Sequence, residues 1–156
     1  MSVSEVSIKF FMPMKVASME KKAPREEVGK IVAQLSKSLQ EKKVKVLGAP
    51  MGLLHDDIKS IDPQKAHYEV CIPISGKVKG EGEVKGKELE KGAFACITHS
   101  GPAEKLPEAY SEILKWVGEN GYRISGSTRE VYHKGAGETG GSPQDVIIEI
   151  QFPIRK

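Results

Sequence analysis

Residues 94–133 read FACITHSGPAEKLPEAYSEILKWVGENGYRISGSTREVYH, and an earlier stretch of the chain repeats their pattern. A shift of 78 residues places residues 16–55, VASMEKKAPREEVGKIVAQLSKSLQEKKVKVLGAPMGLLH, on this stretch without a gap. Identical residues recur in the same order, among them Ala17 and Ala95, Pro24 and Pro102, Glu26 and Glu104, Gly48 and Gly126, and His55 and His133. Because the order is kept over the whole stretch, the sequence predicts an internal duplication.

Each copy predicts the order strand, helix, strand, strand. Apolar residues at helical spacing form one stripe on each predicted helix, at positions 28, 31, 32, 35 and 39 and at positions 106, 109, 110, 113 and 117. The predicted elements are strands at 15–19, 46–55 and 67–74 with a helix at 24–42, and strands at 93–99, 122–133 and 146–154 with a helix at 103–119. A further strand is predicted near 6–11. The sequence therefore predicts an α+β fold, a single domain over 1–156, with βαββ modules at about 14–74 and 92–154.

Composition and charge narrow the functional class. The chain has 156 residues, with 24 Lys and Arg against 21 Asp and Glu, for a formal net charge of +3. Lysines and glutamates alternate in residues 77–92, which predicts a solvated mixed-charge surface rather than the basic face of a nucleic-acid binder. Apolar runs are too short to span a membrane, and the N-terminus lacks a signal-peptide pattern. Cys71 and Cys96 predict buried free thiols, so we expect a cytoplasmic protein without a zinc site.

Carboxylates on the predicted strands are the candidate site residues. Strand residues alternate between two faces, so Ile148 and Ile150 face the helices while Glu149 points away. The repeat relates Glu149 to Glu69, at the start of the same Glu-x-x-x-Pro-Ile pattern. Glu130 lies on the neighbouring predicted strand, and we expect Glu130 and Glu149 to face one cleft between the modules. There they would repel each other until a cation binds. The alternative is that these glutamates are exposed strand residues.

Aromatic residues near these positions predict the kind of ligand. Tyr132 shares a strand face with Glu130, and the predicted second helix carries Tyr110 and Trp116. A carboxylate in a low-dielectric cleft attracts an organic cation, and each aromatic face adds about 0.5–2 kcal/mol of cation–π attraction. For Trp116 and Tyr110 the sequence leaves two interpretations open, core packing and a pocket wall.

Four short motifs in the second half carry a family resemblance. They are His99-Ser100-Gly101-Pro102, Asn120-Gly121-Tyr122, Glu130-Val131-Tyr132, and a final Glu149-Ile150 followed by Pro153. In this combination and order, the chain resembles the GyrI-like effector-binding domain, which also forms the C-terminus of AraC-type and MerR-type multidrug-responsive regulators. The resemblance implies two SHS2-type βαββ modules about a pseudo-twofold axis and a central cleft for bulky hydrophobic or cationic compounds.

The resemblance also implies roles for individual residues. In the family an acidic residue of the Glu-x-Tyr strand or of the final strand meets the positive charge of the ligand, and these positions match Glu130 and Glu149. The predicted ligand-binding residues are Glu149, Glu130, Tyr132, Trp116, Tyr110 and Glu69. Ala103 stands where many relatives have an aromatic residue, which implies a wider cleft mouth.

Three functions compete at this point. The first is a stand-alone binding protein for hydrophobic or cationic small molecules, with no cofactor, no metal, no membrane contact and no direct DNA binding, because no helix-turn-helix segment is present. The second is a hydrolase, as in relatives that hydrolyse reactive cyclopropane-containing, DNA-alkylating natural products; Glu149 would direct the water and Trp116 would line the pocket. The third is a protein partner of the gyrase-inhibitory type.

Overall fold

The computed structural model describes residues 2–22, 27–55, 67–78, 80, 82–134 and 146–156. Its strands form one ten-stranded sheet in which all strand pairs are antiparallel. The strands are β1 (Ser2–Val3), β2 (Ser7–Phe11), β3 (Met14–Lys22), β4 (Met51–Leu54), β5 (His67–Pro73), β6 (Lys85–Leu89), β7 (Gly92–Gly101), β8 (Arg123–Ile124), β9 (Thr128–Lys134) and β10 (Val146–Arg155). The helices are α1 (Val28–Glu41), the short 3-10 helix η2 (Ala103–Lys105) and α2 (Leu106–Glu119).

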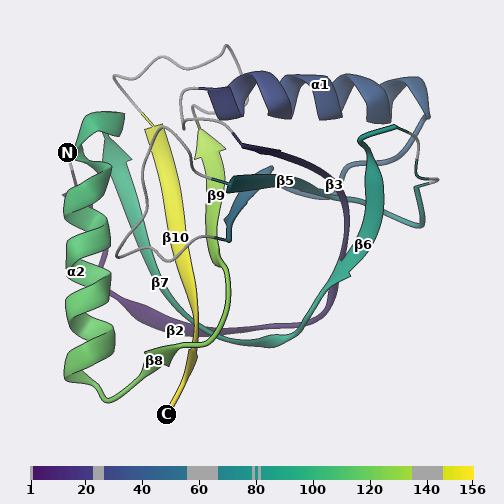
Figure 1. Ribbon diagram of the computed structural model, residues 1–156. Coiled ribbons are helices and arrows are strands. Elements are labelled where there is room, and N and C mark those ends of the chain that lie inside the picture. The colour runs from purple at the N-terminus through teal and green to yellow at the C-terminus, as the bar shows by residue number, and fades with distance from the viewer. Residues whose placement is uncertain (1, 23–26, 56–66, 79, 81, 135–145) are drawn as a thin grey trace.

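The order of strands across the sheet places the two halves of the chain side by side. The order is β1-β7-β10-β9-β4-β5-β3-β6, with β2 also paired to β7 and β8 to β10. The first half supplies β4-β5-β3, the second half supplies β7-β10-β9, and the two meet where β9 pairs with β4. The sheet is strongly curled into a half-barrel (Figure 1). The fold is therefore of the α+β class, as predicted.

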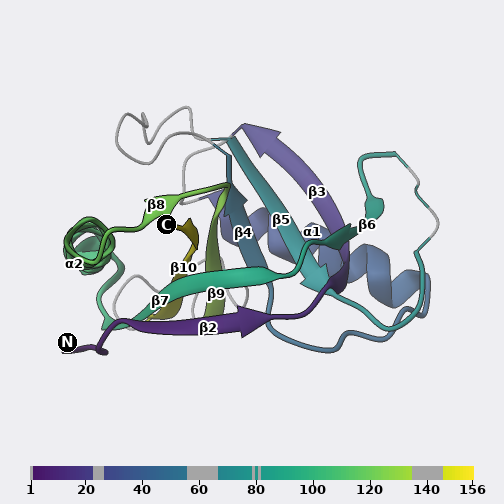
Figure 2. The ribbon, with the colours of Figure 1, turned by 90° about the horizontal axis from the view of Figure 1, so that it is seen from below.

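Both helices cover the same face of the sheet. Helix α1 contacts β3 and β5, and α2 contacts β7, β8 and β10. Their axes run in clearly different directions (Figures 1 and 2). The apolar stripes predicted for the helices are buried in a large core that also takes in the sheet residues Tyr68, Ile150 and Phe152. A smaller apolar cluster lies on the other face and comprises Val16, Met51, Leu53, Cys71, Leu89 and Val131.

The structure revises several predicted bounds. Helix α1 begins at Val28, and residues 23–26 of the predicted helix lie outside the described residues. The strand predicted at 46–55 is reduced to β4 with one isolated bridge at Val46, and the strand at 122–133 divides into β8 and β9. Strand β6 was not predicted, because four of its five side chains are exposed and the segment shows no apolar alternation.

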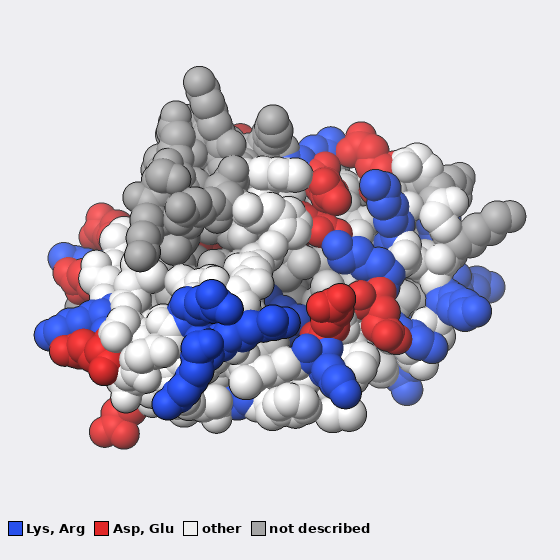
Figure 3. Space-filling view, turned by 60° about the horizontal axis from the view of Figure 1, so that its bottom comes forward, with Lys and Arg blue, Asp and Glu red and all other residues white. Residues whose placement is uncertain are grey.

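The surface carries charges of both signs. Lys and Arg side chains lie next to Asp and Glu side chains across the described part of the face in Figure 3. This view agrees with the predicted mixed-charge surface. Within the described ranges, neither α1 nor α2 is long and apolar enough to span a bilayer.

Candidate functional site

The central feature of the helix-covered face is a fully buried carboxylate, that of Glu130 on β9. Strand β9 lies in the middle of the sheet, where Glu130 is opposite Ile150 of β10 on one side and opposite Gly52 of β4 on the other. Paired residues on neighbouring strands point to the same face. Glu130 therefore shares the helix-covered face with Ile150, inside the core.

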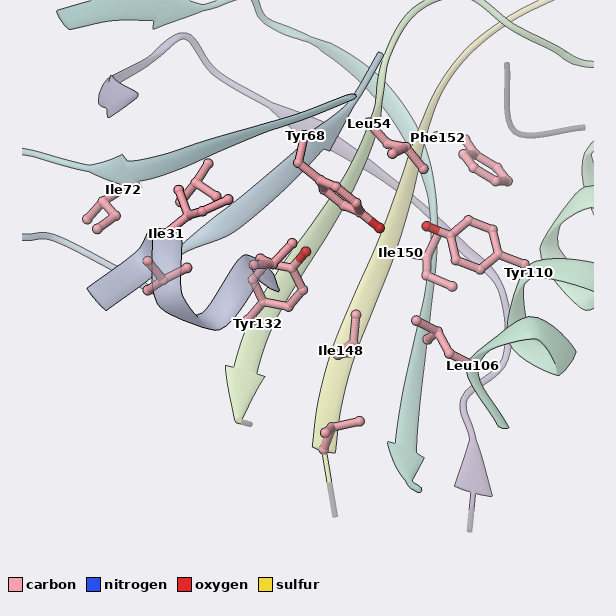
Figure 4. Close-up of a cluster of buried hydrophobic side chains, with 14 of the residues drawn as sticks. Ile31, Leu54, Tyr68, Ile72, Leu106, Tyr110, Tyr132, Ile148, Ile150 and Phe152 are labelled. Carbon is pink, nitrogen blue, oxygen red and sulfur yellow. The ribbon is translucent and has the colours of Figure 1, made fainter. Parts of the chain in front are cut away.

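Tyrosine hydroxyls hold both oxygens of this carboxylate. Tyr132, two residues along β9, donates a hydrogen bond to Oε1 of Glu130 at 2.9 Å. Tyr110 reaches Oε2 from α2 and donates a short hydrogen bond. Tyr68 of β5 is also fully buried, and Figure 4 shows Tyr68, Tyr110 and Tyr132 converging from three different elements. We call Glu130 and these three tyrosines the Glu130 cluster.

The cluster has the composition of a site for an organic cation. An ionised carboxylate accepts hydrogen bonds and attracts positive charge most strongly where water is excluded. Aromatic rings present an electron-rich face to a cation, and the surrounding Leu54, Ile150 and Phe152 provide apolar surface (Figure 4). Because Glu130 is completely buried, a ligand that reaches it must displace at least one side chain that covers it.

Gly52 provides the space that Tyr132 occupies. A methyl group at position 52 would lie 2.5 Å from the Tyr132 hydroxyl and 3.2 Å from the Tyr68 ring. Glycine at this position therefore allows both tyrosines to approach β4 on the side of Glu130.

We expect Gly52→Ala to push the Tyr132 hydroxyl away from Glu130 and to lower the free energy of unfolding by about 1–3 kcal/mol, the usual cost of overpacking. Urea denaturation followed by circular dichroism measures this loss. Gly48→Ala is the matched control, because its methyl group would be in ordinary contact with Pro73 at 3.7 Å. Equal stability of the two variants would contradict the tight fit at Gly52.

The predicted residues Glu149 and Glu69 lie on the opposite face, each already paired with a lysine and a histidine. Glu149 accepts hydrogen bonds from Lys9 at 3.0 Å, His133 at 3.1 Å and Gln151 at 3.0 Å. Burial alone would raise the pKa of Glu149, but these three hydrogen bonds together lower it.

Glu69 has corresponding partners in the first half of the chain. It accepts hydrogen bonds from His55 and Lys87, both at 2.8 Å. Burial acts to raise the pKa of Glu69, and the hydrogen bonds from His55 and Lys87 outweigh it, so that the pKa falls to about 2. Both glutamates are therefore ionised members of ion-pair clusters.

The prediction that Glu130 and Glu149 face one cleft is wrong. The register of β9 and β10 pairs Glu149 with Val131, so Glu130 and Glu149 point to opposite faces of the sheet. Alternation along β10 placed Glu149 correctly, but alternation within one strand does not fix the register against its neighbour. Sequence reasoning also left Tyr68 out of the site, although it had assigned Tyr68 to the helix-covered face.

Trp116 has a packing role in this structure. Its ring stacks on Tyr122 with a centroid distance of 5.8 Å and packs against the main core. It lies on α2, whereas Glu149 lies on the face of the sheet that α2 does not cover. The structure therefore does not bring together the two residues on which the hydrolase hypothesis depends.

The His-x-Gly-Pro motif shapes the turn that leads into η2 and α2. His99 is fully buried, and its Nε2 donates a hydrogen bond to the carbonyl oxygen of Pro102 at 2.8 Å. Gly101 has a φ of +134°, which favours glycine. The motif is explained by the geometry of this turn, which starts the helix that carries Tyr110.

Comparison with known proteins identifies the family. The model of the GyrI-like small molecule binding domain matches residues 4–155, so the chain belongs to this family. The chain is similar to the C-terminal domain of EcmrR, at 23% identity and a TM-score of 0.85, over 97% of this chain and 98% of that one. It also matches EcmrR in a DNA complex, at 22% identity and a TM-score of 0.87, and there it spans only 57% of the EcmrR chain against 97% of its own.

More distant structures share the fold. A hydrolase from Listeria innocua matches at 12% identity and a TM-score of 0.66, over 97% of this chain and 92% of that one. SAV2435, in a structure with bound tetraphenylphosphonium, matches at 10% identity and a TM-score of 0.59, over 97% of this chain and 94% of that one. No curated protein matches the chain significantly.

Proposed function

We propose that this protein binds bulky, apolar organic cations at the Glu130 cluster, with Glu130 as the counter-charge and the tyrosines as the aromatic wall. The observation that carries the proposal is the fully buried carboxylate between α1 and α2, held by the hydroxyls of Tyr110 and Tyr132. Membership of a small-molecule binding family supports it, and so does the bulky organic cation bound by SAV2435.

The proposed binding event exchanges one set of partners of Glu130 for another. The entering cation displaces a tyrosine hydroxyl, and the carboxylate then faces the positive charge directly in a site without water. The freed tyrosine rings stack on the aryl groups of the ligand. Specificity for cations follows, because a neutral or anionic compound would separate Glu130 from its hydroxyl donors without replacing them.

We further propose that the fold arose from two copies of one module related by a pseudo-twofold axis at the β4–β9 junction. The shift of 78 residues relates β2 to β6 and relates Lys9 to Lys87, and each of these lysines pairs with the corresponding glutamate, Glu149 or Glu69. The copies differ at the junction, where Gly52 of the first corresponds to Glu130 of the second. The ligand site would then be the place where the second copy diverged.

Isothermal calorimetry with tetraphenylphosphonium tests the proposed function. We expect saturable binding of this cation, and no binding of tetraphenylborate, which has the same shape and the opposite charge. Equal binding of both ions would show that shape and apolar surface alone drive binding. Absence of binding by any of several aryl phosphonium and quaternary ammonium compounds would overturn the proposal.

A further inference from the structure

A second cavity lies on the face of the sheet that the helices leave uncovered. Its volume is about 750 Å³, within the usual range for small-molecule sites. Residues of β4, β9 and β10 form part of its lining, with Phe11 and Met14 at one side. It shares no lining residue with the Glu130 cluster, because Glu130 and its tyrosines lie on the other face.

The cavity is lined by a buried arginine. Arg129 is 6% exposed, and its guanidinium carbon lies 4.2 Å from the centre of the Phe94 ring. One hydrogen bond, from Nη2 to the carbonyl oxygen of Glu90, is 3.3 Å long. In the part of the chain that the structure describes, no carboxylate lies within 4.0 Å of this guanidinium. A guanidinium has five N–H donors, so most of them have no protein acceptor among the described residues.

The other charged groups of the lining do not neutralise Arg129. Glu149 is held by Lys9, His133 and Gln151, which compensate its charge. Glu88 is exposed on β6, and Lys15 adds positive charge to the lining. Burial lowers the pKa of Arg129, as expected of a charged group that lacks a counter-ion. The cavity thus contains a buried cation whose described surroundings do not supply an anion.

We infer that this cavity is an anion site for a small organic acid, whose carboxylate pairs with Arg129. A carboxylate takes two parallel hydrogen bonds from a guanidinium, and stacking on Phe94 already fixes the plane of the group. The apolar body of the acid would lie against Met14, Met51 and Val131, which line the same cavity.

The position of Arg129 in the sequence repeat supports this assignment. The shift of 78 residues relates Arg129 to Met51, so one half of the chain has a charge where the other has an apolar side chain. Arg129 and Glu130 are consecutive on β9 and therefore point to opposite faces. The same strand would then contribute a cation to one site and an anion to the other, back to back across the sheet.

Fluorine NMR with para-(trifluoromethyl)benzoate and its uncharged analogue para-(trifluoromethyl)benzamide tests this inference on the full chain. We expect the benzoate to bind at least tenfold more tightly than the benzamide. Equal affinity of the two probes, or no saturable binding of the benzoate at millimolar concentration, would overturn the anion site.

Variants assign the benzoate to Arg129. Arg129→Met places the residue of the related position 51 there, and we expect it to abolish the preference for benzoate. Arg129→Lys keeps the charge but loses the paired hydrogen bonds, so it should lose several-fold in affinity, and it decides the question if Arg129→Met does not fold by circular dichroism. Arg123→Gln, an exposed arginine on β8, is the matched control. Unchanged benzoate binding in the folded Arg129 variants would overturn the assignment.

Discussion

Replacing Glu130 with glutamine should weaken tetraphenylphosphonium binding about 10- to 100-fold, the range for losing a charged partner of a buried ligand group. Glutamine keeps the shape of the side chain, so the variant removes the charge and leaves the volume. It still accepts a hydrogen bond from Tyr132 or Tyr110, and the fold should therefore persist. Isothermal calorimetry gives the dissociation constants of both proteins.

Glu149→Gln separates this site from the one that the sequence predicts on the final strand. Glu149 faces the other side of the sheet, so its variant should bind the cation as the unmodified protein does. A loss in Glu149→Gln with binding intact in Glu130→Gln would reverse the assignment. Triphenylphosphine oxide serves as the neutral probe, and it should lose much less affinity on replacement of Glu130. Equal losses for the cation and the neutral probe would show that Glu130 shapes the site without recognising charge.

What the sequence could predict was determined by local patterns. The helix stripes and the alternation along 146–154 depend on neighbouring residues only, and they placed Ile150 and Glu149 on the correct faces. Whether Glu130 and Glu149 share a face depends on the pairing of two strands, which local alternation does not define. The role of Gly52 depends on the distance between β4 and the Tyr132 hydroxyl, a tertiary contact that leaves no local signal.

The pairing of β6 shows the same limit from the other side. Its lysines and glutamates suggest a solvated loop, yet backbone pairing with β3 brings Lys87 to Glu69. An edge strand needs no apolar alternation when its hydrogen bonds to one neighbour hold it in place. The ion pair between Lys87 and Glu69 was therefore out of reach of a pattern-based analysis, although Lys9 and Lys87 are related by the same shift as the rest of the repeat.

Acid should destabilise the protein through Glu69. The pKa of this carboxyl in the folded protein is about 2, against an ordinary value of 4.5. A depressed pKa means that the folded state prefers the ionised form, so the stabilisation is complete above about pH 5 and is lost as the pH falls toward 2. The shift corresponds to about 3 kcal/mol of unfolding free energy. Its physical source is the ion pair with Lys87 and the hydrogen bond from His55.

Urea denaturation between about pH 7 and about pH 3, followed by circular dichroism, measures this dependence. Glu69→Gln should be less stable than the unmodified protein at neutral pH, because Lys87 loses its partner and glutamine carries no charge. The difference between the two proteins should shrink as the pH falls, since protonation removes the same charge from the unmodified protein. Glu112→Gln removes an exposed carboxyl on α2 and controls for the loss of one negative charge. A stability difference that stays constant over the whole pH range would mean that Glu69 contributes through packing rather than through its charge.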